Sequence, residues 1–360
     1  MNSKERLELC LRGSKTDRLP YSPFLAYIWE TFPDDIKQAG ELAFFKSIGA
    51  DPLWRGAPCP VREIFSGMEK KVTNDGNKII IEIITPVGTL REIHTQTNQA
   101  GNTFFLTEHP LKSEEDFKIR LWIEEHRNFV LDLMPVAQHF SANGREGLSI
   151  GMLIPRMKTS FQAMVENLVG TEELTYAFAD FPETVEELLQ KMVENDLKAV
   201  LLAVESDYDF FLTWEDSGTQ NYSPTQYLKY IFPEITQWCQ ILSKYSKFYI
   251  QHACGHVNQL LELMRKSGIC AIESISTMPT GNVELKDARK ALGAEIGIIG
   301  GIEPTQFLSL TLKQLAIYTE NVIASASGGP FILGNSDSCP PGISIEKFKL
   351  VAEIASKFKN

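Results

Sequence analysis

The sequence predicts an α/β protein built as a single (β/α)₈ TIM barrel, and three observations support this fold class. In the second half of the chain, short apolar runs alternate with amphipathic helical patterns, which is typical of a parallel sheet with right-handed crossovers. Four further apolar runs in the first half bring the number of expected strands to eight. No Pro-, Gly- or Ser-rich linker divides the chain, so we expect residues 1–360 to form one domain.

The first half contains the less regular strands. We expect them at residues 21–26, 50–54, 148–153 and 200–205. Between the second and third of these, an Asp75-Gly76 turn lies between two extended runs, a pattern that favours a β-hairpin. Residues 71–106 are therefore predicted to form an antiparallel β excursion from the barrel.

The second half has four regular βα units. The expected strands are residues 248–251, 269–274, 296–300 and 331–333. The helices that follow them are expected at residues 257–264, 284–291, 312–324 and 345–357. Because the strands of such a barrel are parallel, their carboxyl ends meet at one rim, where barrel enzymes place their chemistry.

Composition restricts the classes of function. The net charge of −11 and the lack of a Lys/Arg cluster argue against a nucleic-acid surface. No apolar stretch reaches the roughly 18 residues of a membrane span, and the start of the chain has a charged amphipathic pattern unlike a signal peptide. Six scattered cysteines are typical of reduced thiols. We therefore expect a cytoplasmic protein with no nucleic-acid or membrane partner.

Three potential metal ligands occur where strands should end. His252 and Cys254 come at the end of the fifth strand, and Cys339 lies in the loop after the eighth. An imidazole and two thiolates suit Zn²⁺, and three protein ligands leave a fourth position open, as in catalytic zinc sites. Glu273 ends the sixth strand and is either a displaceable fourth ligand or only a hydrogen-bond partner. The alternative for the cysteines is that they are strand-end thiols without a metal.

Acidic and aromatic residues near the same rim are candidates for catalysis and substrate binding. Glu215 and Asp216 follow the fourth strand and, with Glu273, are candidate catalytic residues. Alternatively, Glu215 or Asp216 caps the helix that begins near Ser223. The candidate substrate-binding residues are Tyr27, Tyr208, Trp214 and Asn335.

The chain resembles the uroporphyrinogen decarboxylase superfamily along nearly its whole length. The similar segments are Lys4-Glu5-Arg6, Asp17-Arg18-Leu19-Pro20, Ile48-Gly49-Ala50-Asp51, Thr85-Pro86-Val87-Gly88-Thr89-Leu90 and Gly300-Gly301-Ile302. More specifically, His252-x-Cys254-Gly255 and Cys339 look like the zinc motif of its corrinoid-dependent methyltransferase branch, which includes the methylcobalamin:coenzyme M methyltransferases. The decarboxylase branch binds porphyrinogen carboxylates with arginines in its amino-terminal segment, and residues 24–30 of this chain contain none.

This resemblance implies a zinc-dependent methyltransferase that moves a methyl group between a small substrate and a corrinoid protein. Zn²⁺ would keep an acceptor thiol as thiolate or polarise the heteroatom of a donor. The corrinoid (methylcobalamin) would arrive on a separate carrier protein, because the chain has no D-x-H-x-x-G segment. Family members are often dimers, so a homodimer is possible.

The substrate and the competing functions stay open at this stage. Aromatic residues near the first strand and beyond the fourth favour an aromatic methyl ether over a small anionic thiol, unless they only pack in the core. The alternative function is a uroporphyrinogen decarboxylase-like decarboxylase of a tetrapyrrole or other polycarboxylate. A third is a non-enzymatic binding protein. Metal content distinguishes the first function from the other two.

Overall fold

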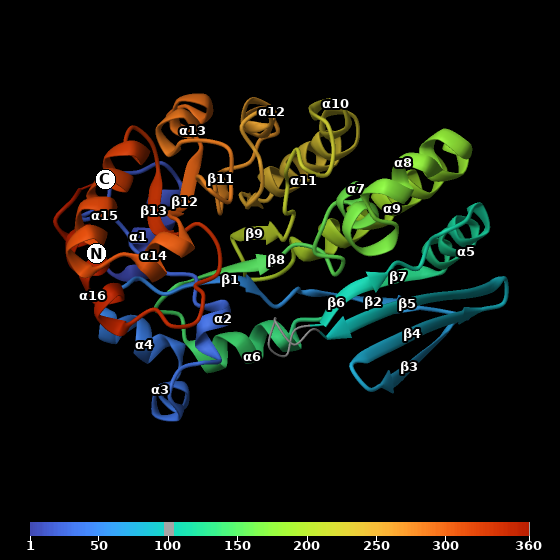
Figure 1. Cartoon of the computed structure of the whole chain (residues 1–360), viewed down its shortest axis with the longest axis horizontal. Helices are drawn as coiled ribbons and strands as arrows, with labels where there is room; N and C mark the ends of the chain where they lie inside the picture. The colour runs from blue at the N-terminus through green and yellow to red at the C-terminus, as the bar shows by residue number, and fades with distance from the viewer. Residues whose placement is uncertain (97–103, 360) are drawn as a thin grey trace.

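The structure is a computed structural model that describes residues 1–96 and 104–359. Its centre is a curled sheet of seven parallel strands in the order β1-β8-β9-β10-β11-β12-β13 (Figure 1). The strands are β1 (Leu53–Ala57), β8 (Leu148–Met152), β9 (Phe210–Thr213), β10 (Phe248–His252), β11 (Ala271–Glu273), β12 (Gly297–Ile302) and β13 (Phe331–Asn335). This is an α/β fold of the TIM-barrel kind, as the alternating pattern predicted.

The first predicted strand, at residues 21–26, is a single bridge in the structure. Tyr21 pairs in parallel with Leu333 of β13. On the other side, the carbonyl of Tyr21 accepts the N–H of Asp51, just before β1, at 2.7 Å. The segment therefore lies between the two edges of the seven-stranded sheet. Prolines flank it on both sides and lack the N–H that a longer ladder requires, which explains why it ends after one bridge.

The strand predicted at residues 200–205 is wrong. Helix α9 (Pro182–Ala203) covers most of this segment, and the strand at that place in the sheet is β9. Val200 and Ala203 are buried whereas Leu201 is 51% exposed, which is the spacing of one face of a helix. A short apolar run cannot by itself distinguish a strand from the end of a buried helix.

Helices lie around the outside of the curled sheet, and the one at residues 114–125 lies farther out, against α9 and the antiparallel strands (Figure 1). Besides α9 they are α2 (Ala26–Trp29), α3 (Asp34–Ala39), α4 (Glu41–Ile48), α5 (Glu114–Glu125), α6 (Met134–Asn143), α7 (Ser160–Ala163), the π-helix η1 (Met164–Leu168), α8 (Thr171–Asp180), α10 (Pro224–Gln226), the π-helix η2 (Tyr227–Ile231), α11 (Phe232–Lys244), α12 (Leu261–Lys266), α13 (Leu285–Leu292), α14 (Pro304–Ser309), α15 (Leu312–Ala326) and α16 (Ile345–Ser356). Among the described residues, no helix has both the length and the apolar character required to cross a bilayer.

Helix α1 (Ser3–Leu11) lies against the amino-terminal end of the barrel. Its Leu7 and Leu11 join an inner apolar cluster made by alternate residues of the strands, such as Ile250 and Ile332. A larger apolar cluster fills the space between the strands and the outer helices. The inner cluster and α1 fill the barrel interior at its amino-terminal end, so the inward-facing polar side chains at the ends of β10 and β11 lie at the carboxyl-terminal end.

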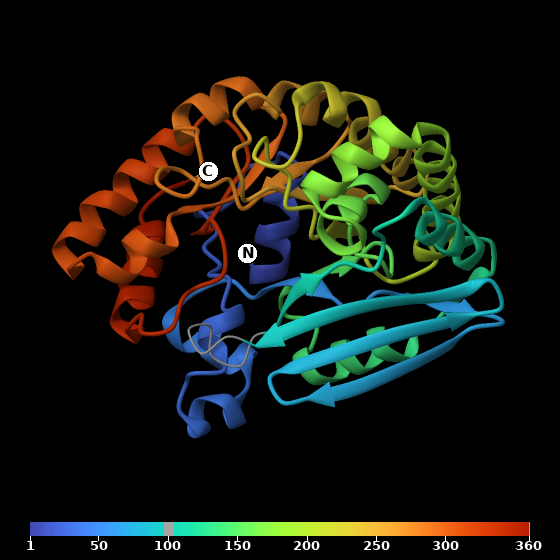
Figure 2. The ribbon, with the colours of Figure 1, turned by 45° about the vertical axis from the view of Figure 1, so that its right-hand side comes forward.

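The predicted β excursion is an antiparallel sheet in the order β3-β4-β5-β6. Its strands are β3 (Glu69–Asp75), β4 (Lys78–Thr85), β5 (Gly88–Gln96) and β6 (Phe104–Glu108), and the predicted turn joins the first two. Residues 97–103 of the predicted 71–106 segment lie outside the described residues. A separate antiparallel pair consists of β2 (Val61–Phe65) and β7 (Arg127–Leu131). Figure 2 shows the four-stranded sheet to one side of the barrel.

Candidate metal centre

The site begins with the alternation of side chains along β10 and β11. Ile250 belongs to the inner cluster, so His252, two residues later in β10, also faces the barrel interior. Ala271 and Glu273 follow the same rule in β11. His252 and Glu273 are direct partners in the register of the two strands, so their side chains meet at the carboxyl edge of the sheet.

A chain of buried charges fixes the ring of His252. Nη1 of Arg55 donates to Oε1 of Glu273 at 2.9 Å, and Oε2 of Glu273 contacts Nδ1 of His252. Burial would raise the pKa of Glu273, but the charges of His252 and Arg55 outweigh it and hold that pKa below its usual range. Metal-binding histidines usually have a carboxylate on the nitrogen that does not bind the metal. Glu273 takes that position, and Nε2 of His252 remains available.

Gly334 on β13 makes room for this arginine. A Cβ added at Gly334 would lie 2.4 Å from the carbonyl oxygen of Ser22 and 3.0 Å from Nη2 of Arg55. Nη2 donates to that same carbonyl at 2.9 Å. A side chain at this position would displace the guanidinium, so the strand requires glycine here.

Asp216 and Cys254 complete a compact set of donor atoms with His252. Nε2 of His252 lies 3.1 Å from Oδ1 of Asp216, and Sγ of Cys254 lies 3.4 Å from the same oxygen. The three ligand atoms all lie within 4.8 Å of one another, and within the described ranges 1–96 and 104–359 no other group of three or more such residues meets this condition. Nitrogen, sulfur and carboxylate oxygen are all donors that Zn²⁺ accepts, so these residues fit a zinc ion.

Lys158 positions Asp216 in this set. Its Nζ lies 2.5 Å from Oδ2 of Asp216 and 2.5 Å from the carbonyl oxygen of Trp214. Burial would raise the pKa of Asp216, but His252 and Lys158 hold it well below its usual range, so the carboxyl is ionised. Asp216 has a φ of 45°, an unusual value for a residue other than glycine. The contacts on both oxygens keep Oδ1 turned toward His252.

The loop after β13 brings Asp337, rather than Cys339, into electrostatic contact with this group. Cys339 is fully buried, its N–H donates to the carbonyl of Phe24 at 2.9 Å, and it is absent from the set of three. Burial raises the pKa of the Cys339 thiol, with Arg55 opposing. Burial also raises the pKa of Asp337, and the charge of His252 is among the effects that oppose this rise. Cys339 as a ligand therefore stays a prediction.

Glu215 supports the neighbouring loop and does not face the donor set. It is fully buried, its Oε2 accepts the N–H of Thr159 at 2.8 Å, and its Oε1 contacts the hydroxyl of the same residue. Burial raises the pKa of Glu215 to about 8, so the carboxyl is protonated at neutral pH. The helix that begins after Ser223 is capped by Ser223 together with Gln226, so Glu215 and Asp216 are not its caps.

The four predicted substrate-binding residues lie in different surroundings. The ring of Trp214 is edge-on to the imidazole of the donor set, with 5.2 Å between centroids. Asn335 is fully buried, and its Oδ1 accepts the backbone N–H of Phe24 at 2.8 Å, so it positions the amino-terminal segment. Tyr208 is 1% exposed and packs in the core, whereas Tyr27 is 65% exposed on the surface.

Three residues of the site were not singled out from the sequence. Arg55 is a basic residue two positions after Leu53 in an otherwise apolar strand, and this inward charge was the signal that could have identified it. Lys158 and Asp337 lie in loops after β8 and β13. No periodicity fixes the direction of a loop side chain, so neither residue could be identified from a comparable pattern.

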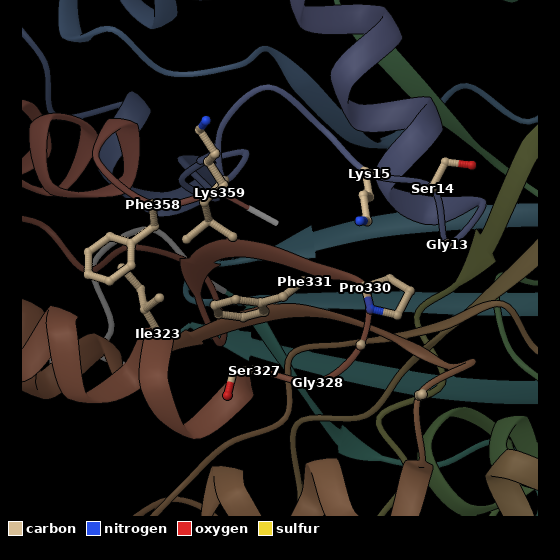
Figure 3. A pocket seen from close by; sticks show the side chains of 13 residues that line it. Gly13, Ser14, Lys15, Ile323, Ser327, Gly328, Pro330, Phe331, Phe358 and Lys359 are labelled. Atoms are coloured by element: carbon tan, nitrogen blue, oxygen red, sulfur yellow. The ribbon is translucent and has the colours of Figure 1, made fainter.

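A cavity of about 300 Å³ lies at the amino-terminal end of β13, the end of the strand that does not carry the donor set (Figure 3). Pro330 and Phe331 lie on its wall, together with Lys15 and Lys359. Its described lining contains no His, Cys, Asp or Glu, so it offers no metal ligand. The donor groups are therefore at the carboxyl-terminal end of the strands, where barrel enzymes have their active sites.

Comparison with known proteins gives one family and one similar fold. The model of the family described as uroporphyrinogen decarboxylase (URO-D) matches residues 159–358. No curated protein sequence matches the chain. A methyltransferase from Methanosarcina mazei is similar in structure, with a TM-score of 0.64 and 12% identity over 99% of each chain, and this likeness shows the fold. A B12-independent methionine synthase from Shewanella sp. W3-18-1 has 11% identity over 96% of this chain and 97% of its own, and its TM-score of 0.39 is too low to support an argument.

Proposed function

Because the chain belongs to the uroporphyrinogen decarboxylase family, we propose that it is an enzyme of that family which transfers methyl groups. In this proposal it is a zinc-dependent methyltransferase that moves a methyl group between a small substrate, a thiol or a methyl ether, and a corrinoid carried by a partner protein. The likeness to the Methanosarcina mazei fold and the resemblance of His252-x-Cys254-Gly255 to a zinc motif support it.

The convergence of three donor atoms carries the proposal. Nε2 of His252, Sγ of Cys254 and Oδ1 of Asp216 lie within 4.8 Å of one another at the carboxyl-terminal end of the barrel. These residues would hold Zn²⁺, with Asp337 as the nearest acidic group of the following loop. When bound, Zn²⁺ acts as a Lewis acid that lowers the pKa of a thiol or polarises an ether oxygen.

The surrounding residues orient these donors. Glu273 holds the imidazole by Nδ1, and Arg55 holds Glu273 in turn, so the ring cannot rotate away. Lys158 occupies one oxygen of Asp216 and leaves the other directed at the donor set. The ring of Trp214 covers one side of the imidazole and limits the access of water.

Elemental analysis of the purified chain tests the metal centre. We expect about one zinc ion per chain, lost in Cys254→Ala and retained in Cys270→Ala, which removes a thiol just before β11 and outside the donor set. The absence of zinc from the wild-type chain would refute the metal centre, and so would zinc that persists in Cys254→Ala.

A methyl-transfer assay tests the reaction. The same two variants are incubated with free methylcobalamin and a thiol, or with reduced cobalamin and a methyl ether, and the corrinoid absorbance is followed. Transfer should occur in at least one direction, and Cys254→Ala should abolish it while Cys270→Ala retains it. Transfer that survives in Cys254→Ala would contradict the role of the metal. Carbon dioxide release from a polycarboxylate without methyl transfer would favour the decarboxylase alternative.

A further inference from the structure

A cavity of about 270 Å³ lies between the antiparallel strands and the helices beside the barrel. Its wall comes from β2, β3, β4, α5, β7, the loop after β8, α7 and η1, on the side of the barrel that carries the antiparallel sheet (Figure 1). No residue of the donor set lines it. Small-molecule sites typically have roughly 300–1,000 Å³, so a compact ligand suits this volume.

The wall of this cavity carries more positive than negative charge. Its only acidic side chain among the described residues is Glu63, whereas its basic side chains are Lys70, Arg120, Arg127 and Arg156. Oε2 of Glu63 lies 2.7 Å from Nη2 of Arg127, so the charge of this carboxylate is already matched. Lys70 forms no ion pair with any described residue. The remaining positive charge favours an anion in the cavity.

Two of the guanidiniums keep N–H groups that the protein does not use. Nη2 of Arg120 donates to Oε1 of Glu124 at 2.5 Å, and Arg156 donates to Glu124 and Asp196 through Nη2 and Nε. Both carboxylates are 0% exposed and neither lines the cavity. Within the described ranges, Nη1 of Arg120 and Nη1 of Arg156 have no acceptor, and neither atom is fully enclosed by protein. Each can therefore donate to a ligand.

The surroundings of Arg120 add an electrostatic reason for an anion. The side chains of Arg120 and Arg156 are only 13% and 7% exposed, so water screens their charges weakly. Burial lowers the pKa of Arg120, and the charges of Arg156 and Arg127 act in the same direction against Glu124. An anion between these guanidiniums would offset both effects.

We propose that this cavity binds a small organic oxyanion, whose charged head accepts hydrogen bonds from Arg120 and Arg156 and whose short apolar body packs beside them. Guanidinium groups are favoured partners of carboxylate and phosphate oxygens, so either head group fits. Most of the remaining wall is apolar and consists of Phe65, Met68, Ile83, Ile123, Ala163 and Leu168. The site is independent of the proposed methyl transfer.

Calorimetric titration with hexanoate tests the site, and hexanamide is the matched probe of similar shape without a charge. Hexanoate, hexyl phosphate or both should bind at least about tenfold more tightly than hexanamide, because only the anions form charge-assisted hydrogen bonds with the guanidiniums. The tighter of the two anions identifies the head group. If neither anion binds more tightly than hexanamide, the proposal is wrong.

Arg120→Met tests the position of the ligand. It retains an unbranched side chain, removes the free N–H groups and should weaken binding of the preferred anion at least about tenfold. Glu124 keeps Arg127 and Arg156 as partners in this variant, so the fold should persist. Zinc content should be unchanged, because Arg120 is outside the donor set. Unchanged anion binding in Arg120→Met would place the ligand elsewhere and overturn the site.

Two variants on β3 provide a test that does not disturb the buried charges. Lys70 is exposed and lines the cavity, so Lys70→Glu should weaken binding of the anion by about 2- to 10-fold. Lys71 is also exposed, but as the next residue of the strand it points to the opposite face and does not line the cavity. Lys71→Glu should therefore bind the anion as the wild type does. An equal loss of affinity in the two variants would show only an effect of net charge and refute the site.

Discussion

Replacing Glu273 by glutamine should weaken both the fold and metal binding. Glu273→Gln preserves the volume of the side chain and removes the negative charge between Arg55 and His252. The side chains of Arg55 and Glu273 are both 0% exposed, so water cannot screen the charge that remains. Breaking a buried ion pair from one side typically costs about 3–5 kcal/mol in the free energy of unfolding. Loss of the carboxylate on Nδ1 should also reduce zinc affinity about 10- to 100-fold.

Two measurements on the same protein test this reasoning. Urea denaturation of the metal-free protein gives the change in unfolding free energy, and competition with a chromogenic chelator gives the zinc affinity. Arg55→Met combined with Glu273→Gln should recover part of the lost stability, because neither buried charge is then left alone. A loss below about 1 kcal/mol in Glu273→Gln, together with unchanged zinc affinity, would refute the role assigned to this chain of charges.

Three other predictions concern the rest of the molecule. Burial raises the pKa of Glu234 well above 4.5, so the folded chain retains a proton that the unfolded chain releases. Stability should therefore fall by up to about 1.4 kcal/mol per pH unit as the pH rises above about 4.5, and Glu234→Gln should remove this part of the slope in denaturation curves. Arg289 donates to four backbone carbonyls, so Arg289→Met should lower the unfolding free energy by about 3 kcal/mol or more without changing zinc content. Cys339→Ala should keep its zinc in elemental analysis, whereas Asp337→Asn should bind zinc more weakly in the chelator titration; the opposite result would restore Cys339 as a ligand.

Strand periodicity explains why part of the site was predictable. His252 and Glu273 end neighbouring strands that are regular in sequence, so their meeting at the carboxyl edge follows from the parallel order. Arg55 was missed because the second strand was predicted to end at residue 54, whereas β1 runs from Leu53 to Ala57. A shift of three residues was enough to place this inward-facing charge outside the predicted strand.

The positions of the loop side chains in the site could not be predicted from the sequence. Asp216 reaches the donor set through a backbone with positive φ and through a contact from Lys158, which lies far away in the sequence. Cys339 and Asp337 are two residues apart in one loop, and only the tertiary fold decides which of them faces the strands. The sequence placed His252 and Cys254 together at a strand end, whereas Asp216 joins them through contacts between distant segments.

The position of α1 has a kinetic consequence. Because this helix packs under the inner apolar cluster, it closes the amino-terminal end of the barrel. Every reactant therefore has to enter through the opening at the carboxyl-terminal end. A macromolecule that docks over this opening would retain a small molecule already bound inside and would prevent any other from entering. The order of addition would then be compulsory, with the small substrate first and the protein second, and steady-state kinetics should show a ternary complex.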